Sequence, residues 1–196
     1  ANGYQILPIG PGTKIPQRFL RGSWSPYSGW SQLAERDTSD VEITTWSAWP
    51  DCGVGLIGGR IAALDIDIVD DPDLALKLED LAREELGDTP ALRIGKAPKR
   101  MLIYATDKPF KGIKRHPIEV LCQGQQFLAY ADHPETQKPY IWPNESLADL
   151  DIGDLPKITE AQAAAFLDKA IALVPEKLRQ SSLTQSSQPA EQHKPA

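Results

Sequence analysis

Two aspartates in the segment IAALDIDIV, residues 61–69, have the type and spacing that suit a divalent cation. Side chains alternate between the faces of a strand, so Asp65 and Asp67 share one face while Leu64 and Ile66 share the other. Two carboxylates about 7 Å apart among apolar neighbours repel each other and lose hydration, unless a cation or hydrogen bonds offset the cost. Because Mg²⁺ takes oxygen ligands from one or two carboxylates, the pair predicts a metal site.

A third acid, Glu119, occurs in the segment IEVLCQG, with Ile118 and Val120 on the opposite face of the expected strand. Three carboxylates could hold two divalent cations about 4 Å apart, which clamp the attacking and leaving oxygens in nucleotidyl transfer. An alternative is that Asp65 and Asp67 line the solvent face of an antiparallel sheet and that Glu119 is an ordinary surface acid. Spacing alone leaves both interpretations open.

Basic residues gather in the segment RIGKAPKR, where Arg93, Lys96, Lys99 and Arg100 surround a glycine and a proline. Glycine lets the backbone approach a ligand closely, and a lysine or arginine nearby forms charge-assisted bonds with phosphate oxygens. The segment therefore predicts a cradle for a triphosphate or a nucleic-acid backbone. A solvated hairpin is the alternative interpretation.

Two further features are candidates for contact with nucleotides or nucleic acid. The basic run KPFKGIKRH, residues 108–116, suits contacts with a template backbone and is equally compatible with an exposed connection. His133, followed by Lys138 and Tyr140, could contact a nucleotide, although a lone histidine is more often structural.

The segment GVGLIG matches the glycine pattern of a dinucleotide-binding loop with Gly53, Gly55 and Gly58. Such a loop needs a strand before the glycines and a helix after them, whereas here a helix is expected before and a strand after. We therefore expect these glycines to form a tight hairpin turn and to allow close packing of strands.

Apolar periodicity and capping signals predict helices and strands in a mixed order. Ser39 and Glu42 form a capping box before the first expected helix, Asp71 and Pro72 begin the second, and Thr159 caps the third. Strands are expected within residues 4–9, 53–59, 60–69, 91–95, 100–106, 118–124 and 126–131. Because helices and strands do not alternate regularly, the pattern favours an α+β fold with a mixed, largely antiparallel sheet.

The 196 residues, of which 41% are hydrophobic, suffice for one sizeable core. We expect one domain over residues 1–180 and a Ser/Gln/Pro-rich linker or tail at 181–196. No apolar run approaches about 20 residues and no signal segment opens the chain, so a soluble, cytoplasmic protein with no membrane partner is expected. Neither Cys52 nor Cys122 has zinc-site spacing, so we expect no zinc. At a net charge of −6, nucleic acid would need a local basic patch.

The acidic strand, the basic turn and the later segment IEVLCQGQQFLAYADHPETQKPYIW occur in an order that resembles the catalytic domain of the archaeo-eukaryotic primase superfamily. Residues 3–142 are similar to the bifunctional DNA primase/polymerase N-terminal (prim-pol) domain of phage, prophage and plasmid replication proteins. The resemblance implies an RNA-recognition-motif-like core with flanking helices. It also implies a nucleotidyltransferase that starts or extends primers, with single-stranded DNA template, primer and nucleoside triphosphates as partners. Members often carry a helicase region downstream.

The resemblance also implies roles for individual residues. Asp65 and Asp67 match the metal-binding acids of the first motif and Glu119 matches the acid of the third, so these three would bind two Mg²⁺ or Mn²⁺ ions. The family's second motif has a histidine that contacts nucleotide phosphates, but the block RIGKAPKRMLIY contains none. The candidates for nucleotide binding are therefore Arg93, Lys96, Lys99, Arg100 and His133.

Two other functions stay open at this stage. A non-catalytic single-strand-binding domain would use the basic loops and stack bases on tryptophans, for which Trp24, Trp30, Trp46 and Trp49 are available. Such a domain does not need the three acids, which would weaken its affinity for DNA. A metal-dependent nuclease would use the acids but has little need for a triphosphate cradle.

Overall fold

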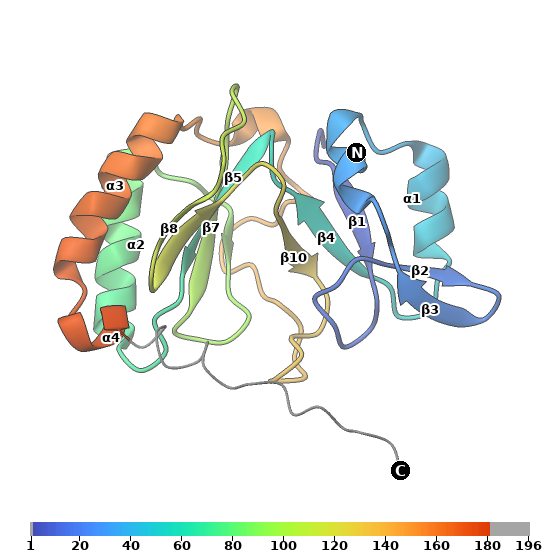
Figure 1. Ribbon diagram of the computed structural model, residues 1–196, viewed down its shortest axis with the longest axis horizontal. Coiled ribbons are helices and arrows are strands. Elements are labelled where there is room, and N and C mark those ends of the chain that lie inside the picture. Colours follow the sequence, from blue (N-terminus) through green and yellow to red (C-terminus); the bar gives the residue numbers. More distant parts are fainter. Residues whose placement is uncertain (1, 181–196) are drawn as a thin grey trace, which may run out of the picture.

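The computed structural model describes residues 2–180, so the linker expected at 181–196 lies outside the described residues (Figure 1). The helices are α1 Asp40–Ser47, α2 Pro72–Leu86, α3 Glu160–Leu173 and α4 Glu176–Gln180, with 3-10 turns at Trp30–Glu35 and Ile152–Asp154. The strands are β1 Ile6–Ile9, β2 Gln17–Leu20, β3 Ser23–Pro26, β4 Gly53–Ile57, β5 Ile61–Ile66, β6 Leu92–Arg93, β7 Arg100–Ala105, β8 Ile113–Arg115, β9 Ile118–Leu121 and β10 Gln126–Tyr130. This arrangement confirms the α+β prediction.

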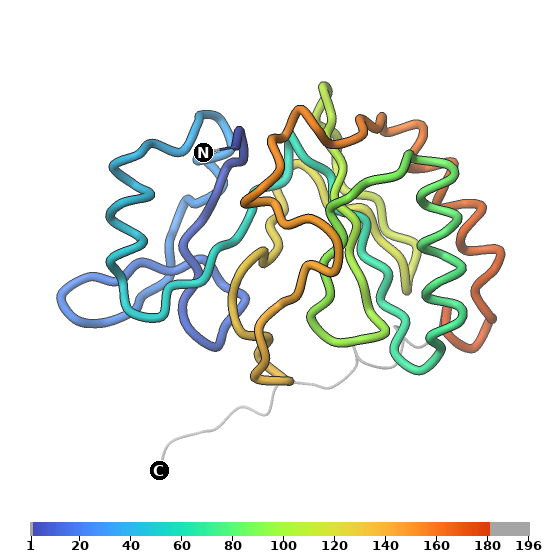
Figure 2. Tube along the Cα trace, turned by 180° about the vertical axis from the view of Figure 1, so that it is seen from behind, coloured from blue at the N-terminus to red at the C-terminus, as the bar shows by residue number. Residues whose placement is uncertain are grey.

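A five-stranded antiparallel sheet with the order β6-β7-β5-β9-β8 carries the acidic residues. Helices α2 and α3 pack side by side on one of its faces, as the ribbon and tube views both show (Figures 1 and 2). Leu64 and Ile66 of β5 are fully buried beneath these helices, together with Leu78 of α2 and Phe166 of α3. This apolar layer fixes β5, so its alternate residues must point to the other face.

The second sheet has the order β1-β4-β10, and here one expectation is wrong. Strands β4 and β5 both exist, but they do not pair as a hairpin, because β4 pairs with β10 while β5 pairs with β9. The chain instead passes straight from one sheet into the other at Gly58. A Cβ atom on Gly58 would lie 2.1 Å from the carbonyl oxygen of Cys122, so only glycine fits at this crossing.

The helix boundaries follow the expected capping residues. Ser39 and Glu42 form the capping box of α1, and Asp71 accepts a hydrogen bond from Leu74 N at the start of α2. Thr159 caps α3, whose buried residues join the core under the five-stranded sheet. The expected helices are therefore confirmed, and α3 is an integral part of the domain.

Three elements went unrecognised in the sequence: the short strand β8, the last helix α4, and the β2–β3 hairpin, whose strands fall in a segment read as a loop. The turn of this hairpin is Arg21-Gly22, with φ angles of 52° and 82°. Such a pair of positive φ angles is typical of the tight type I′ turn, but Arg-Gly is not among its usual sequences.

Candidate active site

One row of side chains crosses the face of the five-stranded sheet that lies opposite the helices, here called the cleft face. Asp65 in β5 is paired in register with Met101 of β7 on one side and with Glu119 of β9 on the other. The row continues to Arg93 in β6 and to Lys114 in β8. Directly opposed residues have Cβ atoms about 5 Å apart, so the sheet brings Asp65 and Glu119 together across 54 residues of sequence.

A polar cleft of about 180 Å³ opens beside this row. Its lining comes from three loops and the end of β5, and consists of Lys14, Asp65, Asp67, Arg93, Gly95, Lys96, Lys99, Arg100, His133, Glu135 and Tyr140. Seven of the eight residues predicted for the site thus line one cleft. Glu119 is the exception, because it lies beside Asp65 in the sheet rather than in the cleft wall.

Asp65 is the most perturbed acid of the site. Burial raises its pKa to about 6, Arg93 opposes this rise, and the charges of Asp67 and Glu119 add to it. A carboxylate that is desolvated among other carboxylates is destabilised, and a cation bound there would relieve that cost.

Lysine side chains contact two of the acids. Lys99 Nζ lies 2.5 Å from Asp67 Oδ1, and Lys114 Nζ lies 3.6 Å from Glu119 Oε2. Because these lysines are flexible and part-exposed, their ammonium groups can move away without disturbing the core. The carboxylates are therefore accessible to another cation.

Arg93 is buried on the same face and makes few polar contacts for an arginine. Its Nη1 donates to the carbonyl of Leu128, and its guanidinium lies 4.5 Å from the centre of the Tyr140 ring. Its Nε has no hydrogen-bond partner in the part of the chain that the structure describes. This places a fixed positive charge near Asp65, where it favours the ionised carboxylate.

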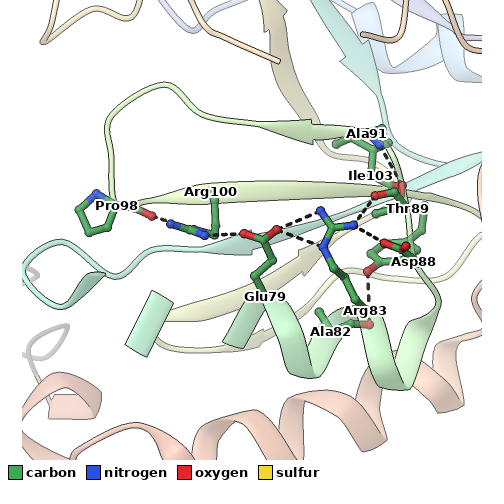
Figure 3. Close-up of polar contacts among 10 residues, drawn as sticks. Glu79, Ala82, Arg83, Asp88, Thr89, Ala91, Pro98, Arg100 and Ile103 are labelled. Carbon is green, nitrogen blue, oxygen red and sulfur yellow. Dashed lines mark hydrogen bonds and ion pairs between the residues drawn. The ribbon is translucent and has the colours of Figure 1, made fainter. Parts of the chain in front are cut away.

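Arg100 lines the cleft, but its guanidinium belongs to a different network (Figure 3). Residue 100 pairs with Ile66 and points toward the helices, where it forms an ion pair with Glu79 of α2 and donates to Pro98 O. Glu79 in turn binds Arg83 at 2.9 Å. Arg100 is thus held by a carboxylate of α2 that it shares with Arg83.

His133 lines the cleft and is buried. Its Nδ1 accepts hydrogen bonds from the backbone N–H groups of Glu135 and Thr136, at 3.2 and 3.4 Å. Burial and the nearby charge of Lys14 lower its pKa, so the ring is neutral at pH 7 and carries its proton on Nε2. Nε2–H is therefore a donor for an acceptor in the cleft.

The tertiary structure adds residues that sequence reasoning missed. Lys14 comes from the loop after β1, and Glu135 forms an ion pair with Lys96 at 2.6 Å across the cleft. No local pattern marks either residue. Gly95 is required where it lies, because a Cβ there would be 2.2 Å from the Tyr140 ring and 2.9 Å from His133.

Comparison with protein families assigns the chain to a family. The family model described as "bifunctional DNA primase/polymerase, N-terminal" matches residues 1–158, most of the chain. The chain belongs to this prim-pol family. No curated protein matches the sequence.

Membership in the prim-pol family confirms the resemblance and supports a DNA primase/polymerase function in replication. At the family level this means a nucleotidyltransferase that uses a DNA template and nucleotides. Prim-pol enzymes generally depend on divalent metal ions. In residues 2–180, no helix has the length and apolar character needed to cross a membrane.

The residues of the cleft fit a divalent cation of the kind that prim-pol enzymes use. Within the described part of the chain, no three His, Cys, Asp or Glu side chains converge as a ready-made metal cage. Mg²⁺ needs only one or two protein carboxylates when phosphate and water fill its other positions. Asp65 and Asp67 supply such oxygens in the cleft, and burial, which raises the pKa of Asp65, leaves its carboxylate poorly solvated, a cost that a bound cation would offset.

Proposed function

We propose that this chain is a template-directed primase/polymerase that extends a primer 3′-hydroxyl or starts a primer by two-metal catalysis. One observation carries the proposal: carboxylates and basic side chains line a single cleft, and nucleotidyl transfer needs acids for the metal ions and cations for the triphosphate. A nuclease needs the acids alone, and a single-strand-binding domain needs neither a buried acid nor a triphosphate cradle.

Asp65, Asp67 and Glu119 hold the cations in this proposal. Two bound Mg²⁺ or Mn²⁺ ions would activate the attacking hydroxyl and neutralise the charge that develops on the α-phosphate as pyrophosphate leaves. Asp65 lies between the other two acids, since it is opposed to Glu119 in the sheet and shares its face with Asp67. It is therefore suited to bridge both ions.

The triphosphate binds to Lys96, Lys99 and His133 of the cleft lining. Lys99, whose ammonium contacts Asp67, would exchange this carboxylate for a phosphate oxygen of the triphosphate, because its side chain is flexible and part-exposed. The Nε2–H of His133 donates to a second phosphate oxygen without adding charge. Arg93 stays in place and favours the ionised form of Asp65.

The catalytic domain in this proposal extends over residues 1–180, beyond the family match. Helix α3 lies outside residues 1–158, yet its Phe166 and Leu167 are fully buried in the core under the catalytic sheet. From the resemblance in motif order, we further propose a role in the replication of a phage, prophage or plasmid, with a helicase region as a downstream partner.

Incorporation of labelled nucleotides on a single-stranded DNA template tests the proposal. The native chain and Asp65→Asn/Asp67→Asn are compared with Mg²⁺ or Mn²⁺, with and without a primer. Metal-dependent synthesis that is lost in the variant supports the proposal, and synthesis without a primer makes the chain a primase. Unchanged incorporation by the variant would overturn the assignment of the metal site. As a second readout, Mn²⁺ should raise the melting temperature of the native chain more than that of the variant.

A further inference from the structure

The first 34 residues differ in charge from the rest of this acidic chain. They contain three basic residues, Lys14, Arg18 and Arg21, but no Asp or Glu, since Glu35 is the first acid. Lys14 lines the catalytic cleft, Arg18 lies in β2, and Arg21 lies at the tip of the β2–β3 hairpin. A basic strip thus leads from the cleft to the tip of the hairpin.

Among the described residues, no carboxylate forms an ion pair with any of these three cations. The basic run at residues 108–116, the other candidate for template contacts, is neutralised in part. Its Lys114 contacts Glu119 and its Arg115 lies 3.5 Å from Asp168, whereas Lys108 and Lys111 form no ion pair within the described residues. Charge that is already neutralised gains less from phosphate, so the hairpin, with all three cations unpaired, is the better anion-binding surface.

The two faces of the hairpin have different roles. Phe19 and Trp24 are opposed in register on one face, and the Trp24 ring packs edge-on against Trp49 with 5.7 Å between ring centres. This aromatic contact anchors the hairpin to the end of α1, so Trp24 is not a free platform for bases. The opposite face carries Arg18 opposed to Ser25, and Leu20, which is 54% exposed, opposed to Ser23.

An aromatic and cationic pair lies at the base of this open face. The guanidinium of Arg18 is 3.7 Å from the centre of the half-buried Tyr27 ring, and Tyr27 N donates to Pro16 O beside the cleft loop. Stacking of this kind holds a planar cation next to a ring, and both groups favour nucleobases and phosphates. At the tip, Arg21 keeps a left-handed φ of 52°, where glycine or asparagine is usual.

Both views show how this surface relates to the cleft loops. The loops after β6, β10 and β1 and then the β2–β3 hairpin follow one another along the same edge of the molecule (Figures 1 and 2). The loop after β1 is the link, because it supplies Lys14 to the cleft and continues directly into β2.

We propose that the open face of the β2–β3 hairpin, formed by Arg18, Leu20, Arg21 and Tyr27, binds single-stranded DNA and guides the template strand to the cleft. The identity of the strand as template rests on the proposed function. Unpaired cations contact the phosphates, Tyr27 and Leu20 contact bases, and the small Ser23 and Ser25 leave room for them. Contacts with phosphates and with the faces of bases do not depend on base identity, so we expect the binding to be independent of sequence.

Binding is measured with a fluorescein-labelled oligothymidylate by anisotropy in EDTA, on an Asp65→Asn/Asp67→Asn background that removes catalysis and metal binding. Arg18→Gln/Arg21→Gln should raise the Kd about tenfold at low salt and reduce the slope of log Kd against log salt by about 1.4, because two phosphate contacts are lost. Tyr27→Leu should raise the Kd roughly fivefold by removing a stacking face.

The matched control is Lys108→Gln/Lys111→Gln, which removes the same charge from the other basic run and should leave the Kd within about twofold. Equal loss in both double variants would overturn the proposal, since it would reflect net charge alone. An unchanged Kd in Arg18→Gln/Arg21→Gln would also overturn it and would assign the surface to a different partner.

A separate incorporation assay, with chains that keep Asp65 and Asp67, distinguishes the hairpin proposal from the proposed polymerase function. If the chain incorporates nucleotides while the hairpin variants bind DNA normally, the hairpin proposal fails and the polymerase function stands. If the chain makes no product while the hairpin variants still bind single-stranded DNA more weakly, the hairpin proposal stands and the polymerase function fails.

Discussion

Arg93 and Arg100 lie on paired strands of one sheet, yet their side chains lie on opposite faces and in opposite electrostatic settings. Arg100 points to the helices, where Glu79, Arg83 and Asp88 complete a chain of ion pairs (Figure 3). Arg93 points to the face opposite the helices, where, among residues 2–180, its Nε has no hydrogen-bond partner and no carboxylate forms an ion pair with it. The comparison separates charge that stabilises the fold from charge held ready for a ligand.

The acids show the same contrast. Glu79 on the helix face of the sheet has two arginine partners, whereas Asp65 on the cleft face has a raised pKa and two acidic neighbours. Removing a buried carboxylate that is paired with arginines destabilises the folded state, because it leaves those arginines unpaired. A buried carboxylate without such partners is destabilised by desolvation and by neighbouring acids, and a bound cation would relieve this. Variants on the two faces should therefore separate activity from stability.

The largest expected effect is on nucleotide incorporation, in a variant on the cleft face of the five-stranded sheet. Asp65→Asn should lower the rate of nucleotide incorporation about a thousandfold, because it removes the carboxylate proposed to bridge both cations. Steady-state incorporation on a primed template measures this. Asp88→Asn on the helix face is the control and should keep the rate within about twofold. A comparable loss in both variants would remove the distinction between the faces.

The next effect is on stability at the helix face. Glu79→Leu should lower the free energy of unfolding by about 3 kcal/mol, because it leaves Arg83 and Arg100 partly buried without their shared acid. Urea unfolding followed by tryptophan fluorescence measures the change. Incorporation per folded molecule should stay near the native value, and adding Arg100→Met should recover part of the stability. Loss of activity without loss of stability would instead give Glu79 a role in the site.

Asp65→Asn should have the opposite effect on stability. The pKa of Asp65 is about 6 in the folded state and about 3.9 in the unfolded state, so the folded state binds the proton more tightly. Native stability contributed by this group is therefore present below about pH 4 and is lost as the pH rises through 6. At pH 8 without metal, the variant should be more stable by about 3 kcal/mol, and the difference should vanish near pH 4. Thermal unfolding across this range checks the sign.

The smallest effect concerns the basic wall. Lys99→Gln should weaken nucleoside triphosphate binding about tenfold by removing one charge-assisted bond, and should leave the Kd for template unchanged. Titration with a fluorescent nucleotide and anisotropy with labelled template measure the two affinities. Lys138→Gln, an exposed lysine that does not line the cleft, is the control. A larger loss of template than of nucleotide binding would assign Lys99 to the template side.

Much of this molecule follows from local sequence. The capping boxes at Ser39 and Thr159, the cap at Asp71 and the alternation around Asp65 and Glu119 each act within a few residues, so the elements they define were predicted. The shared face of Asp65 and Asp67 is a consequence of strand geometry alone. The order of these motifs also led to the prim-pol family, which the family match confirms.

Strand pairing and cleft composition depend on contacts between distant segments, which local patterns do not encode. The glycines around Gly58 predicted a hairpin, but the close approach of Cys122 carries the chain from one sheet to the other. The β2–β3 hairpin went unrecognised because its Arg-Gly turn carries little signal, and Glu135 reaches the cleft only through tertiary packing.

The sequence by itself determined which residues could do chemistry, because residue type and strand periodicity are local properties. Only the tertiary structure decided which charges are available. Arg93 and Arg100 have the same chemistry and belong to one basic segment, but the register of β6 and β7 directs them to opposite faces. Glu79 then neutralises one and leaves the other beside Asp65, since a buried charge is governed by the partners that folding brings to it.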